Sequence, residues 1–471
     1  MDIRHDVTIK SWDGTWTYRP KVLVTPNTVD DLIEIMTSEV RFPSPVRPAG
    51  AMHFTARMNG DEQGGTMVNM TAMNRILRFG EDTVTVEAGV NYITVSNALK
   101  ERGLMFHVTT EIGNTTLAAM ATAATKDSSF PGEFGQISSY VTAVKLVTPQ
   151  GEIREINERD HPEEMQILRS SYGLLGIVFE VTIRVKPTVA LSVRHHSMGL
   201  AEFRKRFPVY KAQGYAVMYY VFPYVRRVLV ELRKENPGVT PKSRRRWSYR
   251  NRFWRKYGPA ITLWIKSRTS NRTLRDFADR MHFFILRQGL VRVVRSDATW
   301  PHAQIINYPR DPGPFKYLFS MWAFPERDFF DHLDAYCDFL AEYDAKTGFR
   351  CDLPSVGYYI SQDRGALLSY CWDGPTLSID PASTGGKEWE EFLKVYNMFC
   401  SERGGFPLFN QTPFLTREEA QKAFGPRLKL FAEYRRQADP ENRLLDAYWR
   451  ELLGEDILEP SSAPSASQPA G

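Results

Sequence analysis

A turn of small residues ahead of a histidine is the first feature of the sequence that could carry chemistry. Residues 47–55 read RPAGAMHFT, a short β-type run that enters Gly50 and Ala51. Because these residues lack side-chain bulk, successive backbone N–H groups can curve around a phosphate, with His53 at the rim of the loop. One glycine and one histidine in a turn are more often structural, so this pattern alone favours no function.

A second run of small residues, at 112–125, consists mostly of Gly, Ala and Thr and is followed by Lys126, Asp127 and Ser128. Such a segment lets the backbone approach a flat or phosphorylated ligand, and its hydroxyls supply hydrogen bonds. A helix packed closely against a sheet through its alanines is an equally good interpretation. A third segment, residues 171–178, places Gly176 directly before a strand-like run.

The elements that must position these segments alternate between short β-branched runs and amphipathic helices from residue 21 to residue 187. Residues 29–40 predict a helix, since apolar side chains at 29, 32, 33 and 36 fall on one face. Residues 90–103 predict a second helix, which Gly103 ends. Strands are predicted at 21–26, 45–50, 66–70, 83–89, 140–151 and 176–187. The pattern is typical of an α+β fold.

A different pattern follows, with strands at 215–224 and 225–234 and a helix at 327–343, which predicts a second domain. Two helix-like segments, at 417–437 and 443–454, come after it. The last residues are rich in Pro, Ser and Ala and cannot bury enough apolar surface to become ordered. We therefore expect four units: 1–187, a cap at 188–415, a helical segment at 416–458 that returns to the first domain, and a disordered tail at 459–471.

The composition is that of an enzyme-sized globular protein, with 471 residues, 42% of them hydrophobic, and a net charge of +5. That excess of charge is too small to argue for nucleic acid. The four cysteines form no C-x-x-C pair, so we expect reduced structural thiols and no metal site. The first residues lack the apolar stretch of a secretory signal, and no window has the roughly 18 apolar residues that cross a bilayer. These features predict a cytoplasmic protein.

A basic, aromatic segment at 244–256 is the one place where charge gathers. Cationic side chains that interleave with tryptophans suit an anionic lipid interface, whereas nucleic acid would use the same chemistry. The favoured interpretation is a solvated helix of the cap whose tryptophans face the core, and weak peripheral membrane association is the alternative. The residues are Arg244, Arg245, Arg246, Trp247, Tyr249, Arg250, Arg252, Phe253, Trp254, Arg255 and Lys256.

The three small-residue segments, in this order, resemble the FAD-binding domain of the vanillyl-alcohol oxidase and p-cresol methylhydroxylase superfamily. The nearest likeness is to the aldonolactone and alditol oxidases, whose first motif has Arg, Gly and His at the positions of Arg47, Gly50 and His53. Phe54 stands where Ser is usual. The resemblance implies a PCMH-type FAD-binding domain, a cap domain with an antiparallel sheet, and C-terminal helices that return to the FAD domain.

The resemblance also implies roles for particular residues. Backbone groups of both small-residue loops would hold the pyrophosphate, and the residue matching His53 carries the flavin covalently in lactone and alditol oxidases. Residues 123–128 would lie near the isoalloxazine and residues 177 and 178 near the adenine. The cofactor-binding residues so implied are Arg47, Gly50, Ala51, Met52, His53, Phe54, Gly113, Asn114, Thr116, Ala123, Thr125, Ser128, Ile177 and Val178.

Several residues depart from the family pattern. The usual Thr-His-Gly-Ser is replaced by residues 125–128, TKDS, in which Lys126 and Asp127 either pair locally or set charge near the flavin. Alditol oxidases have a Glu and an Arg on a strand of the cap, and these two positions fall near Gly357 and Tyr359 in this sequence. A Lys near the C-terminus of those enzymes is replaced here by Asn410 or Gln411. These losses argue against a simple transfer of the polyol or lactone substrate. The predicted pocket is lined by Tyr358, Tyr359, Tyr370, Trp372, Asn410 and Gln411.

We therefore expect an FAD-dependent oxidoreductase that oxidises a CH–OH group of a sugar, sugar lactone, polyol or other alcohol, with oxygen or another acceptor reoxidising the flavin. Tyr359, Asn410 and Gln411 are the predicted catalytic residues. The base that removes the hydroxyl proton is left open among Tyr359, Asp363 and Asp373. A flavin-dependent reductase or dehydrogenase of a lipid-linked or specialised metabolite at a membrane surface is the alternative function.

Overall fold

The computed structural model describes residues 1–61, 63–241, 245–268, 271–289, 298–308, 313 and 316–454. The predicted tail at 459–471 lies outside these residues. The first layer is a four-stranded sheet in the order β1-β4-β6-β5, in which β6 runs parallel to β4 and β5. Its elements are β1 (Asp2–Arg4), β4 (Val22–Thr25), α1 (Val29–Thr37), β5 (Val46–Ala49) and β6 (Thr66–Asn69).

A six-stranded antiparallel sheet in the order β11-β10-β12-β8-β7, with β9 paired to β12, forms the second layer. Helix α3 packs on β8 and β12. The alanine-rich segment thus forms a helix against the sheet, which is one of the two interpretations of its sequence. The elements are β7 (Ile76–Phe79), β8 (Thr83–Glu87), α2 (Tyr92–Glu101), β9 (Leu104–Phe106), α3 (Leu117–Thr122), β10 (Val141–Val147), β11 (Ile153–Asn157), α4 (Pro162–Leu168) and β12 (Ile177–Pro187).

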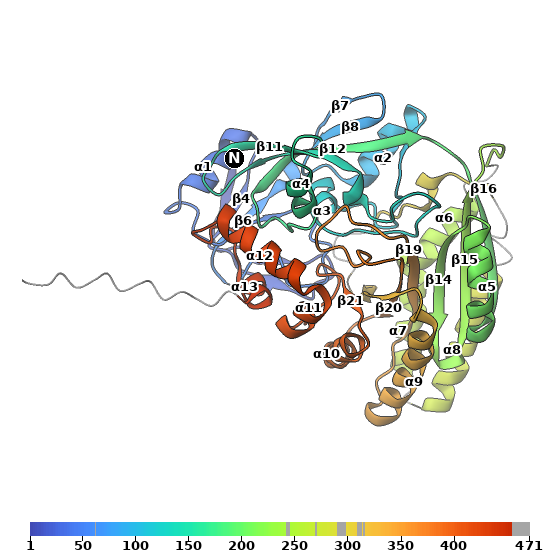
Figure 1. Cartoon of the computed structure of the whole chain (residues 1–471). Helices are drawn as coiled ribbons and strands as arrows, with labels where there is room; N and C mark the ends of the chain where they lie inside the picture. The colour runs from blue at the N-terminus through green and yellow to red at the C-terminus, as the bar shows by residue number, and fades with distance from the viewer. Residues whose placement is uncertain are drawn as a thin grey trace, which may run out of the picture.

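The third layer is a nine-stranded antiparallel sheet in the order β16-β13-β15-β14-β19-β20-β18-β21, with β17 paired to β20. Helices α5 and α9 pack on it, and Figure 1 shows them beside its strands. The elements are β13 (Leu191–Gly199), α5 (Leu200–Ala212), β14 (Ala216–Phe222), β15 (Arg227–Glu235), β16 (Ala298–Thr299), β17 (Leu318–Phe319), β18 (Trp322–Pro325), α9 (Phe329–Thr347), β19 (Leu353–Ile360), β20 (Thr376–Ser383), α10 (Lys387–Glu402) and β21 (Phe406–Pro407).

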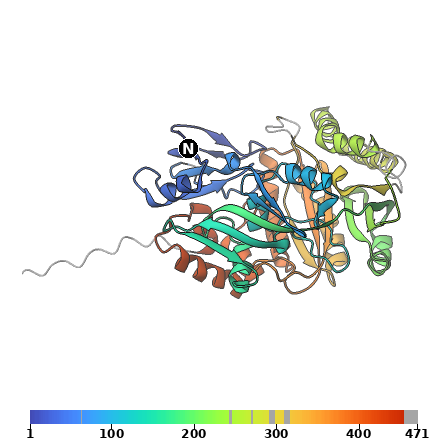
Figure 2. The same cartoon turned by 90° about the horizontal axis from the view of Figure 1, so that it is seen from above.

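The predicted basic segment forms α6 (Arg245–Arg252) and a π-helical turn at Phe253–Tyr257, and α7 (Gly258–Arg268) and α8 (Arg272–Arg287) follow. Trp247 and Trp254 are buried, which confirms the interpretation that the tryptophans face the core. Figure 2 shows these yellow-green helices at one end of the molecule, away from the N-terminal sheets. The side chains of Arg244, Arg245 and Arg246 lie outside the described part of the structure.

The C-terminal helices α11 (Arg417–Phe424), α12 (Pro426–Ala438) and α13 (Ala447–Leu453) return to the N-terminal layers, as Figure 1 shows. Arg443 donates to the carbonyl oxygen of Ile35 over 2.7 Å, and Arg47 forms an ion pair with Asp446 over 3.0 Å. The predicted α+β class and the returning helices are thus confirmed. Strand β12 ends at Pro187, and the division into domains at this point stays a prediction.

All four cysteines are buried, and none of them forms a disulfide within the described ranges. In the described ranges, no helix is both long enough and apolar enough to cross a membrane. Within the same ranges, no group of three His, Cys, Asp or Glu side chains is placed to hold a metal ion.

Candidate functional site

A cradle of small residues lies where the loop after β5 meets the N-terminus of α3. It encloses about 660 Å³ of empty space, including open solvent. The residues that line it come from all three segments singled out in the sequence. They are Pro48, Ala49, Gly50, Ala51, Met52, His53, Phe54, Asn59, Met70, Ala88, Thr115, Thr116, Ala118, Ala119, Thr122, Tyr172, Gly173, Gly176 and Val178.

Two glycines show how closely the backbone segments approach one another in the cradle. A Cβ added at Gly50 would lie 2.1 Å from Oγ1 of Thr116, across the cradle. Gly176 has φ +149°, and a Cβ there would lie 2.6 Å from the carbonyl oxygen of Val147. Only glycine fits both positions, so the loops bring backbone N–H groups to a narrow concave surface suited to an anionic ligand.

His53 lies at the junction of this cradle and a second cavity, since it lines both. Burial lowers the pKa of its imidazole to about 4, although the nearby Asp13 opposes the shift. Its Nδ1 atom is buried and has no hydrogen-bond partner among the described residues. The ring packs on Trp12 at a centroid distance of 4.9 Å. His53 is therefore a neutral imidazole with an unused nitrogen lone pair or N–H group.

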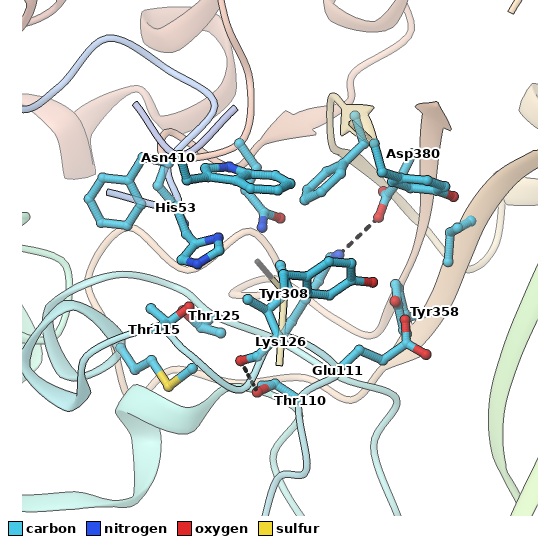
Figure 3. Close-up of a pocket in the computed structure, with 18 of the residues that line it drawn as sticks. His53, Thr110, Glu111, Thr115, Thr125, Lys126, Tyr308, Tyr358, Asp380 and Asn410 are labelled. Atoms are coloured by element: carbon cyan, nitrogen blue, oxygen red, sulfur yellow. Dashed lines mark hydrogen bonds and ion pairs between the residues drawn. The ribbon is translucent and has the colours of Figure 1, made fainter. Parts of the chain in front are cut away.

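The second cavity, called the large cavity below, encloses about 1090 Å³ of empty space, including open solvent, between the cradle and the nine-stranded sheet. Figure 3 shows His53 and Asn410 on one side, Asp380 and Tyr358 on the other, and Lys126 between them. Eight of the twenty lining residues are Phe, Trp or Tyr. The lining residues are Trp12, His53, Phe54, Thr110, Glu111, Ile112, Thr115, Met120, Thr125, Lys126, Tyr220, Trp254, Tyr308, Tyr317, Phe319, Val356, Tyr358, Asp380, Asn410 and Gln411.

A buried ion pair crosses the large cavity. Nζ of Lys126 lies 3.0 Å from Oδ2 of Asp380, and both side chains are almost fully buried. The ammonium also lies 4.4 Å from the ring centroid of Tyr358, a cation–π contact. Asp127 pairs instead with Arg233 of β15 over 3.0 Å. The predicted local pair of Lys126 and Asp127 is therefore wrong, because neighbouring side chains in this extended segment point to opposite sides.

A second buried cation lies at the far end of the large cavity. Arg250 of α6 forms an ion pair with Glu111 and donates to the hydroxyl of Tyr220 over 3.1 Å. Trp254 of the same segment stacks on the Tyr220 ring at 5.0 Å. Part of the predicted solvated basic helix therefore builds the wall of the site.

Comparison with known proteins assigns the chain to a family. Residues 20–157 match the FAD binding domain, and residues 181–452, more than half of the chain, match the D-arabinono-1,4-lactone oxidase family. The chain belongs to this family. The predicted relationship to lactone oxidases is confirmed, and the protein is an FAD-dependent oxidoreductase that acts on a CH–OH donor.

The individual relatives have low sequence identity to this chain, although two of the alignments cover nearly its whole length. L-gulonolactone oxidase of Scyliorhinus torazame is 22% identical over 447 residues, 93% of this chain and 96% of that protein. L-gulono-1,4-lactone dehydrogenase of Mycobacterium tuberculosis is 21% identical over 462 residues, 94% of this chain and 98% of that protein. The match to D-arabinono-1,4-lactone oxidase of Kluyveromyces lactis is 23% identical over 280 residues, 56% of this chain and about half (53%) of that protein.

Solved structures show the same fold. Cholesterol oxidase from Brevibacterium sterolicum has a TM-score of 0.74 at 13% identity, with 96% of this chain and 97% of that chain covered. The matched family and the lactone oxidases and dehydrogenases do not support the alternative of a flavin-dependent reductase or dehydrogenase of a lipid-linked or specialised metabolite at a membrane surface.

The structure brings about half of the predicted cofactor residues of this flavoprotein to a cavity wall. Seven of them line the cradle, and two of these seven, His53 and Phe54, also line the large cavity. Thr125 lines the large cavity alone. Arg47, Gly113, Asn114, Ala123, Ser128 and Ile177 line neither. The seven in the cradle are Gly50, Ala51, Met52, His53, Phe54, Thr116 and Val178.

The predicted residues that line no cavity support those that do. Arg47 is a buried clamp, since its guanidinium donates to the carbonyl oxygens of Met58 over 3.1 Å and Tyr172 over 2.8 Å. Asn114 donates to the carbonyl oxygen of Tyr308 over 3.0 Å and so fixes a wall residue of the large cavity. The hydroxyl and N–H of Ser128 both donate to the Asp127 carboxylate.

The three predicted catalytic residues do not lie together, because Tyr359 and its neighbour Tyr358 are on opposite faces of β19. Tyr358 lines the large cavity, whereas the Tyr359 ring lies on the opposite face, 5.6 Å from the Phe207 ring of α5. The side chains of a strand alternate between its two faces. This geometry leaves Tyr359 outside the cavity that Asn410 and Gln411 line.

The other candidate bases, Asp363 and Asp373, and two predicted pocket residues, Tyr370 and Trp372, also lie elsewhere. Asp363 is buried and accepts hydrogen bonds from Ser139 over 2.5 Å and Gln136 over 3.1 Å. Asp373 and Tyr370 line a separate surface groove, and Trp372 lies beside Arg427. None of these four lines the large cavity.

Sequence reasoning missed several wall residues because no local pattern marks them. Asp380 lies in β20, whose sequence contains no functional motif, and Trp12 lies in a turn near the N-terminus. Lys126 was detectable only through its departure from the family motif. Trp12, Thr110, Glu111, Thr115, Tyr220, Tyr308, Tyr317, Phe319 and Asp380 were not predicted as site residues.

Proposed function

We propose that the chain oxidises a CH–OH group of a sugar lactone or a similar polyhydroxylated ring bound in the large cavity. The observation that carries this proposal is the combination of aromatic side chains in the wall with two buried oxygens that have no hydrogen-bond partner among the described residues, Oδ1 of Asp380 and Oδ1 of Asn410. Aromatic faces suit the C–H face of a sugar ring, and oxygen acceptors suit its hydroxyls. The printed names of the relatives, which are oxidases and dehydrogenases of aldonolactones, support the same class.

The cradle fits FAD. Backbone N–H groups of Gly50, Ala51 and Met52 would hold the pyrophosphate, with Thr116 opposite and Val178 toward the adenine. Thr125 would contact the isoalloxazine where the cradle opens into the large cavity. When bound, FAD accepts the hydride of the substrate C–H bond. The chain's own part is to orient the ring between aromatic side chains and to exclude water from it.

We also propose that His53 carries the flavin covalently. Its imidazole is neutral and lines both cavities, and its Nδ1 has no hydrogen-bond partner within the described ranges, as a nucleophile requires. Acid precipitation of the purified protein tests this proposal. Flavin should stay in the pellet for the wild type and move to the supernatant for His53→Ala. Flavin released from the wild type, or retained by the variant, contradicts it.

Anaerobic bleaching of the flavin tests the substrate class. We expect sugar lactones to bleach the 450-nm band, and aromatic alcohols of similar size to bleach it at least about tenfold more slowly. A panel in which only non-sugar alcohols react would overturn the proposal. Peroxide release on admission of air separates an oxidase from a dehydrogenase that uses another acceptor.

We further propose peripheral association with anionic membranes. In the predicted segment 244–256, Trp247, Arg250 and Trp254 are buried, whereas Tyr249 is exposed. The helices after it expose a row of large apolar side chains, with Trp264 at 62% and Phe277 at 60% exposure, and exposed arginines flank the row. Such a surface fits an anionic bilayer. The row is Ile261, Trp264, Leu274, Phe277, Met281, Phe284 and Ile285.

Vesicle flotation tests this surface. The wild type should float with phosphatidylserine-containing vesicles and not with phosphatidylcholine alone, and Trp264→Ser/Phe277→Ser should lose most of the floating fraction. Ile153→Ser/Met398→Ser removes two exposed apolar side chains elsewhere and should float like the wild type. Equal flotation of both double variants contradicts the assignment.

A further inference from the structure

The large cavity contains a carboxylate oxygen to which no described residue donates a hydrogen bond. Oδ2 of Asp380 accepts from Lys126, whereas Oδ1 is buried and has no hydrogen-bond partner in the described part of the chain. The side chain is only 5% exposed. A buried carboxylate oxygen without a donor is costly, and a bound ligand or water that supplies a donor removes this cost.

The other acidic and phenolic groups of the cavity are less suited to accept a proton. The Glu111 carboxylate is held by Arg250, whose guanidinium also contacts Tyr220. Burial raises the pKa of the Tyr358 hydroxyl well above its ordinary value, so this phenol stays neutral. Asp380 is left as the carboxylate with a free oxygen among the described residues of this wall.

Lys126 holds the carboxylate in place. Its ammonium has three N–H groups and uses one on Oδ2 of Asp380, while the Tyr358 ring lies beside it at 4.4 Å. The pair joins the segment after α3 to β20, two parts of the chain 254 residues apart. Since Lys126 engages Oδ2, Oδ1 remains available on the same carboxylate.

We propose that Asp380 is the catalytic base that binds the reacting hydroxyl of the substrate and takes its proton, and that Lys126 is its positioning residue. The substrate O–H bond breaks and its proton passes to Oδ1. The C–H bond breaks with its electron pair, which leaves as hydride for oxidised FAD, and the C=O double bond forms. This inference rests on the proposed function, since it requires a CH–OH donor in the large cavity.

The electrostatic surroundings suit this role. Burial raises the pKa of Asp380. Lys126 opposes this rise, and the Ser378 hydroxyl opposes it to a smaller extent. Among the described residues, the titratable groups besides Lys126 whose pKa Asp380 influences electrostatically are tyrosines on neighbouring elements, each with a pKa raised by burial and therefore neutral. They are Tyr219, Tyr317, Tyr358, Tyr370 and Tyr396.

Asp380→Asn tests the base directly. The amide keeps the shape and an acceptor oxygen but cannot take a proton, so the anaerobic rate of flavin reduction should fall about 10²- to 10⁴-fold. Lactone binding, followed by quenching of tryptophan fluorescence, should change by less than about threefold. Asp373→Asn, an exposed carboxylate of the separate groove, should reduce flavin at the wild-type rate.

Lys126 supplies a second, independent readout. Only ionised Asp380 accepts a proton, so reduction slows as the pH falls through the pKa of Asp380. Lys126→Met removes the cation that lowers this pKa, so the acidic limb of the profile should move to higher pH, and Lys126→Arg should restore it. Flavin content and melting temperature report whether each variant folds.

Failure of the proposed function and failure of the assignment of Asp380 as the base give different results. If no lactone or polyol bleaches the wild type, the proposed function fails. If the wild type is bleached and Asp380→Asn is bleached equally fast, or Lys126→Met leaves the acidic limb in place, the assignment of the base is overturned while the function stands.

Discussion

The cradle and the large cavity are built from the sequence in different ways. The cradle uses backbone groups and small side chains from short contiguous segments, with Gly50 packed against Thr116. The large cavity uses long side chains from at least five elements, and its central charges, Lys126 and Asp380, come from segments 254 residues apart in the chain. The comparison indicates that cofactor binding depends on backbone geometry, whereas substrate chemistry depends on tertiary placement of side chains.

The largest effect is expected in the cradle. Gly50→Ala places a Cβ 2.1 Å from Thr116 Oγ1, so one loop must move, and bound flavin should fall at least about tenfold by the ratio of absorbance at 450 and 280 nm. Thr116→Gly in the same chain should restore loading. Gly199→Ala, where nothing lies within 4 Å, is the control. Full loading of the single variant would show that the cradle tolerates more bulk.

Removal of the clamp behind the cradle should have the next largest effect. Arg47→Met leaves Asp446 as a buried charge without its cation, which costs about 3–5 kcal/mol of folding free energy. Thermal melting followed by circular dichroism measures the loss. Arg4→Met, which breaks an exposed ion pair with Asp2, should change the melting temperature little. Equal effects would refute the clamp.

The two faces of β19 should respond differently. Tyr358→Phe removes a hydroxyl in the large cavity and should raise the KM for the lactone about 2- to 10-fold, whereas Tyr359→Phe should leave both kcat and KM unchanged. Steady-state kinetics on the two purified variants provides the comparison. A larger effect at Tyr359 would restore the catalytic role predicted from the sequence.

The smallest change is expected in the pH dependence of flavin attachment. The pKa of His53 is lowered from 6.5 to about 4, so its neutral, nucleophilic form persists as the pH falls from 8 to 5. Attachment of FAD to apoprotein, followed by acid-stable absorbance, should therefore stay nearly constant over this range. A histidine of ordinary pKa would lose about 30-fold of its neutral form by pH 5.

The difference between the two regions also explains what could be predicted from the sequence. Gly50, His53 and Thr116 lie in short motifs whose local conformation follows from residue type, and all three line the cradle. Periodicity gave the helix at 90–103, which the structure has as Tyr92–Glu101, and overestimated the first helix, which ends at Thr37. Local rules succeed where backbone conformation is the deciding factor.

Tertiary placement is the part that local rules could not supply. Tyr359 and Tyr358 are equivalent by composition, and only the register of β19 against β14 and β20 decides which one reaches the cavity. Asp127 is the nearest acid to Lys126 along the chain, yet Asp380 pairs with it. Strand pairings between distant segments determine both outcomes.

The central claim is that His53 stands where the cradle and the large cavity meet and carries the flavin. Mass spectrometry of proteolytic peptides from the flavin-loaded protein tests it most directly. We predict that the peptide containing His53 carries the added mass of FAD and that fragmentation places this mass on the imidazole. A flavin mass on another residue, or an unmodified His53 peptide from fully loaded protein, would contradict the account.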